Sequence, residues 1–528
     1  MDQDEQAGRL PFRLWIGVTG HRELPADPEL VERVREVLGR VRGAVPASDA
    51  TPLRLGVVSS LAEGADRLVA GEVLGSEGAL LEVPLPLPRH EYVRDFASQG
   101  SREEFAELLA RASLVTVVPD MGAREETYAE AGRLVVDRCD ALVAIWDGAP
   151  SRGVGGTADA VVHARARRVP VYWIRTGGEA GYELVEEPGN GLPLARFGQV
   201  DRYNRARVPP GDLATRVEAE TGRLRAEAER AGLPAGVVEP ALAWYLPFLA
   251  RADALSLRLQ RRYHRLGLAL FVLAALAAVA GGASIKGWSR QLTVAQVLLL
   301  LVPTGLSVNA RYRQLPARWI SCRLLAEQLR AAMFLTVAGL EPGRDRSDLL
   351  DPSVGWVQAA SAEVCLRGPR GAPPATAAGE LRRFLLGGWV DHQLGYLRRT
   401  GERQRRRDGV LGTAVSWLFL VTLVLTLAKA FLAGDEPGGP GVALALFLSA
   451  LPALGAAFSG VREQRQYVRN SERSLRVSGH LERLRIRLSA AKDLGSVQEL
   501  AMATAVLLSD ENRDWFGVMG AGNLTPAP

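Results

Sequence analysis

Four apolar runs in the second half of the chain constrain its fold more than any other feature. They span Leu266–Ile285, Leu292–Val308, Val410–Leu432 and Gly441–Val461. Each has about 17 to 23 residues, and a helix of that length crosses a hydrocarbon core of about 30 Å. Lys429 is the one charge inside them, and it lies close enough to an end to reach the membrane interface. We therefore expect four transmembrane helices.

The runs form two close pairs with basic outer ends. The connections Gly287–Gln291 and Gly434–Pro440 are short, so each pair predicts a hairpin. Arginines flank the outer ends of both hairpins: Arg258, Arg261, Arg262, Arg265, Arg311, Arg313, Arg318, Arg398, Arg399, Arg403, Arg405, Arg406, Arg407, Arg462, Arg465 and Arg469. The positive-inside rule then places both termini and residues 311–409 in the cytoplasm of a multi-pass inner (plasma) membrane protein.

The two hairpins also resemble an internal repeat. Gln260-Arg261-Arg262 before the first pair recurs as Gln404-Arg405-Arg406 before the second. A basic amphipathic helix is predicted after each pair, at Pro316–Leu335 and Val468–Leu488. The first run is rich in small residues suited to close helix packing, and no acidic ring sets cation selectivity. A four-helix anchor and a pore therefore both remain open.

The first half of the chain alternates short apolar runs with amphipathic stretches. The helix predicted at Pro28–Arg42 has Leu30, Val34, Val37, Leu38 and Val41 on one face. This β-α-β cadence of uniformly apolar strands predicts a doubly wound parallel α/β sheet. The predicted strands are Arg13–Val18, Arg54–Ser59, Ala79–Pro84, Leu114–Val118, Ala141–Trp146 and Pro170–Ile174.

We expect five regions along the chain of 528 residues: an α/β domain at 12–176, a linker with connecting helices at 177–265, the first hairpin with its cytoplasmic helix at 266–338, a cytoplasmic connecting region at 339–409, and the second hairpin with its helix at 410–518. Residues 177–210, rich in Gly, Pro and charge, predict an irregular excursion. Helices are predicted at Leu213–Ala231, Val237–Leu249 and Ala252–Arg265.

Composition excludes several classes of protein. Cys139, Cys322 and Cys365 are scattered, so neither a disulfide framework nor a cysteine metal site is predicted, and no metal is expected. The net charge is +5, and the arginines cluster beside the apolar runs. This distribution favours a lipid bilayer over nucleic acid as the partner. The acidic start at Met1–Glu5 lacks the basic region of a cleaved signal peptide.

Glycines and charged residues gather where three predicted strands end. The ends read Gly17-Val18-Thr19-Gly20-His21-Arg22, then Ser59 to Asp66, then Asp147-Gly148 followed by Gly153 to Asp159. Glycines let backbone N–H groups approach an anion, and the next helix N-terminus adds partial positive charge. We predict a ligand-binding set of Gly17, Thr19, Gly20, Arg22, Gly64, Asp66, Asp147, Gly148, Gly155, Gly156 and Thr157. Tight turns and first-turn acids are the plainer explanation of the same residues.

Together these motifs, with Ser60-Leu61-Ala62-Glu63-Gly64-Ala65-Asp66-Arg67-Leu68 and Ala144-Ile145-Trp146-Asp147-Gly148, resemble the SLOG superfamily. That group includes LOG-type nucleotide phosphoribohydrolases, the DNA-processing protein DprA and the sensing domains of TRPM channels and bacterial conflict systems. The resemblance covers residues 12–176 and implies a Rossmann-like fold that binds a nucleotide or nucleotide-derived ligand.

One departure from the LOG pattern weakens the case for hydrolysis. LOG enzymes carry Pro-Gly-Gly-x-Gly-Thr-x-x-Glu, and alignment on Gly156-Thr157 puts Ala160 at the acid position, with Asp159 one residue early. Arg152 and Val154 replace the proline and the second glycine. The candidate catalytic acids are therefore Glu63, Asp66 and Asp159, and binding is the preferred interpretation.

The hairpin units resemble the SLATT domain, a membrane effector linked to SLOG sensors. This resemblance implies a homo-oligomer that permeabilises the membrane in a bacterial conflict or antiphage defence response. We thus predict a nucleotide-sensing membrane effector, with a membrane-anchored phosphoribohydrolase as the alternative. A transporter is disfavoured because both halves run in the same orientation and no midplane ionisable residue is present.

Overall fold

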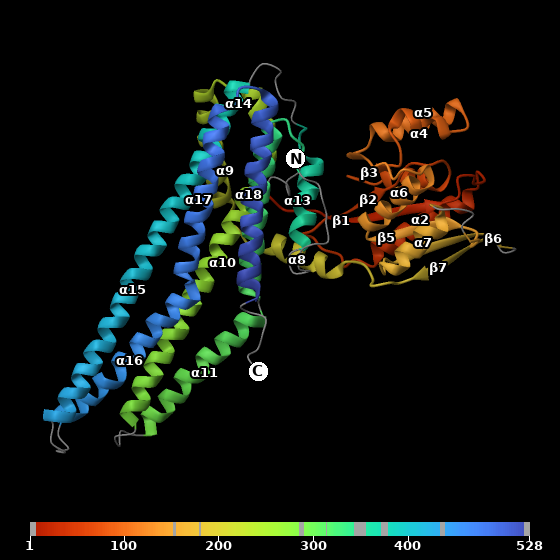
Figure 1. The fold of residues 1–528 in the computed structure, drawn as a ribbon. Coiled ribbons are helices and arrows are strands. Elements are labelled where there is room, and N and C mark those ends of the chain that lie inside the picture. Colours follow the sequence, from red (N-terminus) through yellow and green to blue (C-terminus); the bar gives the residue numbers. More distant parts are fainter. Residues whose placement is uncertain are drawn as a thin grey trace. The chain divides into compact units, whose positions relative to one another are not determined.

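The chain forms two compact units (Figure 1). The first comprises residues 1–207 and 343–368, and the second comprises 208–342 and 369–528. The computed structural model describes residues 7–150, 155–178, 181–284, 290–312, 314–342, 355–370, 378–432 and 439–521. We call the two parts the α/β unit and the helical unit.

The α/β unit is built on a seven-stranded sheet in the order β4-β3-β2-β1-β5-β6-β7. All neighbouring strands are parallel except β6 and β7, which are antiparallel. The six predicted strands are confirmed as β1 (Phe12–Gly20), β2 (Leu53–Val58), β3 (Leu80–Leu85), β4 (Leu114–Val117), β5 (Ala141–Trp146) and β6 (Val171–Gly178). The predicted doubly wound, mostly parallel fold is therefore confirmed.

Helices follow most strands, as the cadence predicts. They are α2 (Pro28–Gly43), α3 (Ala65–Leu74), α4 (Arg89–Tyr92), the short η1 (Val93–Asp95), α5 (Gln99–Ala110), α6 (Arg124–Arg138) and α7 (Thr157–Ala166). Asp27 caps α2 by accepting a hydrogen bond from the Glu29 N–H, and proline at its first position fits the helix start. The buried face of α2 consists of the five residues predicted for it.

The expected irregular excursion at 177–210 is wrong, because it contains β7 (Gly181–Glu187) and α8 (Leu194–Arg205). Exposure alternates along much of β7, with Glu183 and Glu186 outward, as expected of a half-exposed edge strand. Asn204 of α8 fixes the start of β1: its Oδ1 accepts from the Leu10 N–H at 2.9 Å, and its Nδ2 donates to the Leu10 carbonyl at 2.7 Å.

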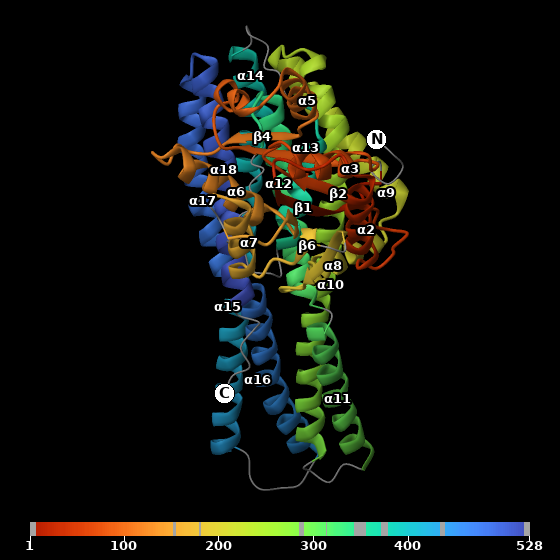
Figure 2. The same cartoon turned by 90° about the vertical axis from the view of Figure 1, so that its right-hand side faces the viewer.

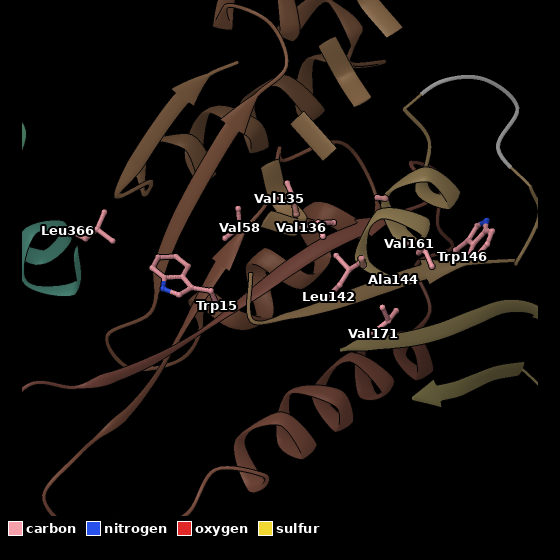
Figure 3. Close-up of a cluster of buried hydrophobic side chains, with 12 residues drawn as sticks. Trp15, Val58, Val135, Val136, Leu142, Ala144, Trp146, Val161, Val171 and Leu366 are labelled. Atoms are coloured by element: carbon pink, nitrogen blue, oxygen red, sulfur yellow. The ribbon is translucent and has the colours of Figure 1, made fainter. Parts of the chain in front are cut away.

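The α/β unit also takes in α13 (Gly355–Arg367), from the region expected to connect the two hairpins. Leu366 of this helix joins a buried cluster around Trp15, Leu142 and Val136 on the sheet and α6 (Figure 3). Burying such side chains stabilises the fold by about 1.5–3 kcal/mol each. The unit therefore depends on a segment distant in sequence from the rest of it.

The helical unit consists of α9 (Pro210–Ala231), α10 (Ala235–Ser284), α11 (Arg290–Tyr312), α12 (Leu315–Val337), α14 (Ala378–Leu385), η2 (Leu386–Val390), α15 (Asp391–Leu432), α16 (Gly439–Arg465), α17 (Tyr467–Ala490) and α18 (Leu494–Ala521). The two connecting helices and first apolar run predicted between residues 237 and 285 form one continuous helix, α10, despite Pro240 and Pro247 inside it. Ile285 lies outside the described residues.

Two described helices are long and apolar enough to cross a membrane. They span Ala235–Ala280 and Ala378–Phe431, and 17% and 0% of their apolar windows are buried within the chain. Length and composition alone do not show that a helix spans a membrane, because the core helix of a soluble protein passes the same test. The shorter apolar stretch Thr293–Val302 lies in α11. The structure thus supports a helical unit with two candidate spans.

The two hairpin units share a backbone plan. In each, α11 or α16 packs against the helix before it, and α12 or α17 then packs against that same helix. Gln314 and Gln466 precede α12 and α17, and both adopt left-handed backbone conformations, with φ of 48° and 47°. Figure 2 shows the pairs α10–α11 and α15–α16, and α10 also packs on α16. The resemblance between the two sequence repeats therefore extends to their backbones.

Candidate ligand-binding site

The predicted ligand site lies at the point where the strand order reverses. From β1 the chain proceeds to β2, β3 and β4 on one side, then returns to β5 on the other side of β1. In open α/β sheets, ligands bind outside the carboxyl ends of the strands at such a point. Gly20 at the end of β1 is level with Ile145 of β5, and the His21 N–H donates to the Ile145 carbonyl at 3.0 Å.

The first two glycine turns touch each other here. A Cβ on Gly20 would lie 2.4 Å from the Ala65 Cβ and 2.6 Å from the Ile145 carbonyl oxygen. Gly64 has φ of +76°, and its Cβ would lie 2.3 Å from the His21 carbonyl oxygen. Only glycine fits either position without a shift of the backbone. The close approach brings the start of α3 against the end of β1, where the Ala65 N–H donates to the His21 carbonyl.

The third predicted turn is joined to the first through His21 and Asp147. The Asp147 N–H donates to Nε2 of His21 at 3.2 Å, and an Asp147 carboxylate oxygen lies 3.4 Å from the same nitrogen. The Ala149 N–H, which donates to Asp147, lowers the pKa of that carboxyl. Gly148 has φ of +88° and lies against the Trp173 ring. Both His21 and Asp147 keep about 40% of their side chains exposed (37% and 42%).

The loop from Ser59 to Gly64 is strained and holds a buried acid. Leu61 is fully buried yet has φ of +56°, which is unfavourable for a bulky side chain. The Asp66 carboxylate accepts hydrogen bonds from Ser59 Oγ at 2.9 Å and the Ala62 N–H at 3.3 Å. Burial raises the pKa of Asp66 to about 6, although Ser59, Ala62 and nearby arginines oppose the shift.

The other two candidate acids have structural partners. Glu63 accepts hydrogen bonds from the Ala97 N–H at 3.1 Å and from the Ser101 hydroxyl. Asp159 accepts from the Gly155 N–H at 2.8 Å, and so closes the turn that precedes α7. Each carboxylate therefore has a structural role through one of its oxygens, Oε1 of Glu63 and Oδ2 of Asp159. Arg152 and Val154, on which part of the comparison with LOG enzymes depends, lie outside the described residues.

Two helices begin at this end of the sheet without a side-chain cap. The N-cap residues are Gly64 for α3 and Gly156 for α7, and neither helix start receives a side-chain hydrogen bond. Uncapped N–H groups and the helix dipole favour an anion. Thr157 is the first residue of α7, and Thr19 is half-buried beside Gly20. Gly155 has φ of +91° and packs against the backbone of α6.

Gly17 has a different environment from the rest of the predicted set. It lies inside β1 and is buried, and a Cβ there would lie 2.7 Å from Cys139 Sγ. Its absent side chain leaves room for packing beneath the sheet. The convergence at the strand ends therefore involves Gly20, Gly64 and Asp147 directly, and does not extend to Gly17.

A cluster of aromatic and charged side chains beside Arg22 was not predicted from the sequence. The Arg22 guanidinium lies 5.7 Å from the centre of the Tyr128 ring. The Tyr128 hydroxyl donates to Asp95, which also accepts from Arg124 at 2.5 Å. Burial and Asp95 raise the pKa of Tyr128 to about 12. These residues come from η1 and α6, and no motif spacing connects them to Arg22.

Arg67 was also missed, although it lies within the second motif. It is buried, donates from Nε to the carbonyl of the strained Leu61 at 3.1 Å, and reaches Ser101 and Glu104 at 2.8 Å. Its place directly after Asp66 in the Ser60–Leu68 motif is the sequence feature that could have identified it. Arg67 links the strained loop to α5 and so fixes the shape of this side of the site.

The arrangement is suited to hold an anion rather than to cleave a bond. It offers glycine-lined backbone, two helix starts without side-chain caps and the exposed Arg22, whereas the described candidate acids are hydrogen-bonded within the protein. Among the described residues, no group of three or more His, Cys, Asp or Glu side chains could hold a metal ion. No protein-family model matches this chain, and no curated protein is significantly similar to it.

Proposed function

We propose that this protein is a membrane effector whose α/β unit binds a nucleotide or nucleotide-derived signal. The observation that carries the proposal is the meeting of Gly20, Gly64 and Asp147 at the reversal point of the sheet, beside two helix starts without side-chain caps. Phosphate groups suit such N-termini, and Arg22 supplies a charge-assisted hydrogen bond. The resemblance of the motifs to the SLOG superfamily supports the same ligand class.

The helical unit is proposed to span the inner membrane four times, with both termini in the cytoplasm. Exposed apolar side chains on all four helices support this, for example Leu276, Leu301, Val424 and Phe447, which are 50–61% exposed. A soluble helix would bury such residues. The arginine-rich outer ends and the SLATT-like repeat add the orientation and a homo-oligomeric effector that perturbs the membrane in a defence response.

Calorimetry on the full-length protein in detergent tests the sensing step. A panel of nucleoside monophosphates, cyclic nucleotides and dinucleotides is titrated into wild type and into Arg22→Gln. We expect saturable binding of at least one compound and a weaker response from the variant. The proposal fails if no compound on the panel binds to the folded wild-type protein.

Dye release from liposomes tests the effector step. Protein reconstituted with an encapsulated dye is mixed with the compound that binds in calorimetry. A pore predicts release that requires this compound, because a ligand shifts an equilibrium only through unequal affinity for two states. Binding without release leaves the four helices as an anchor.

The alternative is a membrane-anchored phosphoribohydrolase, and the raised pKa of Asp66 favours it. A buried carboxyl with a pKa of about 6 is protonated often enough near neutral pH to act as a general acid. This alternative predicts that free base is released from a nucleoside monophosphate. Loss of release is expected in Asp66→Asn or Asp159→Asn. If no compound on the panel is turned over, hydrolysis is excluded.

A further inference from the structure

A groove of about 440 Å³ lies between α15 and α16. Asp408, Gly412 and Ser416 line it at four-residue intervals, and so share one face of α15. Thr413 and Trp417 lie beside them, and Arg462 contributes from α16. A groove of this size is in the range of small-ligand sites.

Arg462 is held in one orientation at the mouth of the groove. Its Nε and Nη2 donate to the two Asp408 carboxylate oxygens at 2.5 and 2.7 Å. The guanidinium carbon lies 3.6 Å from the position of a Cβ on Gly412, so the group lies against the α15 backbone. Nη1 has no hydrogen-bond acceptor among the residues that the structure describes, and it keeps two donors for a ligand.

The groove presents the cation of this ion pair and hides the anion. The Arg462 side chain is 42% exposed, whereas that of Asp408 is 14% exposed. An incoming anion therefore meets the guanidinium first. Asp408 holds Arg462 in place, because a bidentate pair fixes both position and orientation.

The position of the groove along α15 indicates what kind of anion reaches it. Four arginines lie just before it, at Arg403 and Arg405–Arg407, and exposed apolar residues follow from Val410. Trp417 is 61% exposed, and tryptophan is enriched at membrane interfaces. The lining changes along the helix from charge at Asp408 to hydroxyl at Ser416 and then to Leu420. Polar headgroup, glycerol and acyl chain follow in the same order in a phospholipid.

We propose that this groove binds the phosphate headgroup of an anionic phospholipid from the cytoplasmic leaflet. Nη1 of Arg462 donates to the phosphate, the hydroxyls of Thr413 and Ser416 donate to phosphate or glycerol oxygens, and Trp417 with Leu420 lies along the acyl chains. The inference rests on the proposed membrane placement of α15 and α16. It adds a lipid site to the helical unit that is separate from the ligand site of the α/β unit.

Native mass spectrometry of the full-length protein in detergent tests the proposal, with phosphatidylglycerol and phosphatidylcholine as the probes. Wild type is expected to retain phosphatidylglycerol at least about tenfold more tightly, because both lipids offer a phosphate but the choline cation of phosphatidylcholine is repelled by Arg462 and the arginines before the groove. Arg462→Gln should remove this preference.

Arg406→Gln is the matched control. It makes the same change of charge on α15 but lies on the side of the helix away from Asp408. We expect it to change retention less than about twofold, as for an exposed charge. Equal losses in Arg406→Gln and Arg462→Gln would reduce the effect to general charge attraction and overturn the site. Equal retention of the two lipids by wild type would also overturn it.

Two further measurements separate other outcomes. Glycerol phosphate at millimolar concentration is added in place of lipid, and displacement of phosphatidylglycerol by it at equal affinity would show a soluble-phosphate site instead. Membrane fractionation of expressing cells is run in parallel. Recovery of the protein in the soluble fraction contradicts the proposed function itself, whereas a membrane-inserted protein without lipid preference contradicts the groove alone.

Gly412→Leu, which fills the groove, should reproduce the loss in Arg462→Gln while Asp408 and Arg462 remain.

Discussion

The two ends of β1 differ in how they use charge. At the amino end, Arg13 and Glu363 form a bidentate pair at 2.6 and 2.7 Å, with side chains only 2% and 4% exposed. At the carboxyl end, His21 and Asp147 stay about 40% exposed (37% and 42%), and Arg22 is exposed. The first end is closed by helices α8 and α13, with only a cavity of about 20 Å³ between them, enough for one water.

This difference indicates that the amino end of β1 belongs to the structural scaffold and the carboxyl end to the candidate binding site. Charged groups at the amino end satisfy one another, so changes there should alter stability. Those at the carboxyl end keep donors exposed beside a strained loop, so changes there should alter binding, and some should even raise stability. Four substitutions test the distinction.

The largest effect on stability is expected at the closed end. Glu363→Gln leaves the Arg13 guanidinium buried opposite a neutral group, which should lower the free energy of unfolding of the α/β unit by about 3–5 kcal/mol. Differential scanning calorimetry of the full chain measures the transition. The double variant Arg13→Met with Glu363→Leu should recover most of the loss. A loss below about 1 kcal/mol for Glu363→Gln would show that the closed end is not held by this pair.

The next effect lies at the junction of the two glycine turns. Gly64→Ala puts a Cβ against two backbone carbonyl oxygens at a φ of +76°, and we expect a loss of about 2–4 kcal/mol. Gly71→Ala is its control within α3, because no atom lies within 4 Å of that Cβ. It should raise stability by about 0.5–1 kcal/mol. The same sign for both variants would contradict a requirement for glycine at the junction.

A pH-dependent effect is expected from Asp66. Because its pKa in the folded protein is about 6, above the value of 3.8 for an exposed aspartate, folding favours the protonated form. The contribution is complete below pH 3.8 and is lost as the pH rises to about 6, a change of about 3 kcal/mol. Asp66→Asn, which can still accept from Ser59 and Ala62, should remove that fall. Unfolding curves of the two proteins that run parallel from pH 4 to pH 7 would contradict the buried acid.

Sequence patterns predicted those elements of the α/β unit that are determined by residues close together in the chain. Apolar runs located β1 to β6 because a doubly covered strand buries both faces, and glycine at Gly20 and Gly64 marked a real close approach. They missed β7, because an edge strand carrying Glu183 and Glu186 has little apolar signal. They also missed the partner of Arg13, because Glu363 lies 350 residues away.

The candidate site shows the same limit. The strand-end residues Gly20, Arg22 and Asp147 were predicted because each lies in a motif next to a strand. The partners that occupy Glu63 and Asp159, and the burial of Asp66, depend on loops packed from elsewhere in the sheet. Sequence alone could therefore nominate acids, whereas only the fold shows that they are already hydrogen-bonded.

The smallest effect on stability, with the clearest effect on function, is expected from Arg22→Gln. Arg22 is exposed, so the free energy of unfolding should change by less than about 0.5 kcal/mol. Affinity for the proposed nucleotide ligand should fall about ten- to a hundredfold, since one charge-assisted hydrogen bond to its phosphate would be lost. Arg54→Gln makes the same change of charge at the amino end of β2, where Arg54 is paired with Glu77 at 2.8 Å. Calorimetric titration should show unchanged affinity for Arg54→Gln, because a ligand at the carboxyl ends of the strands is beyond its reach. Equal losses of affinity in the two variants would mean that the ligand responds to net charge, and the contrast between the two ends would not describe binding.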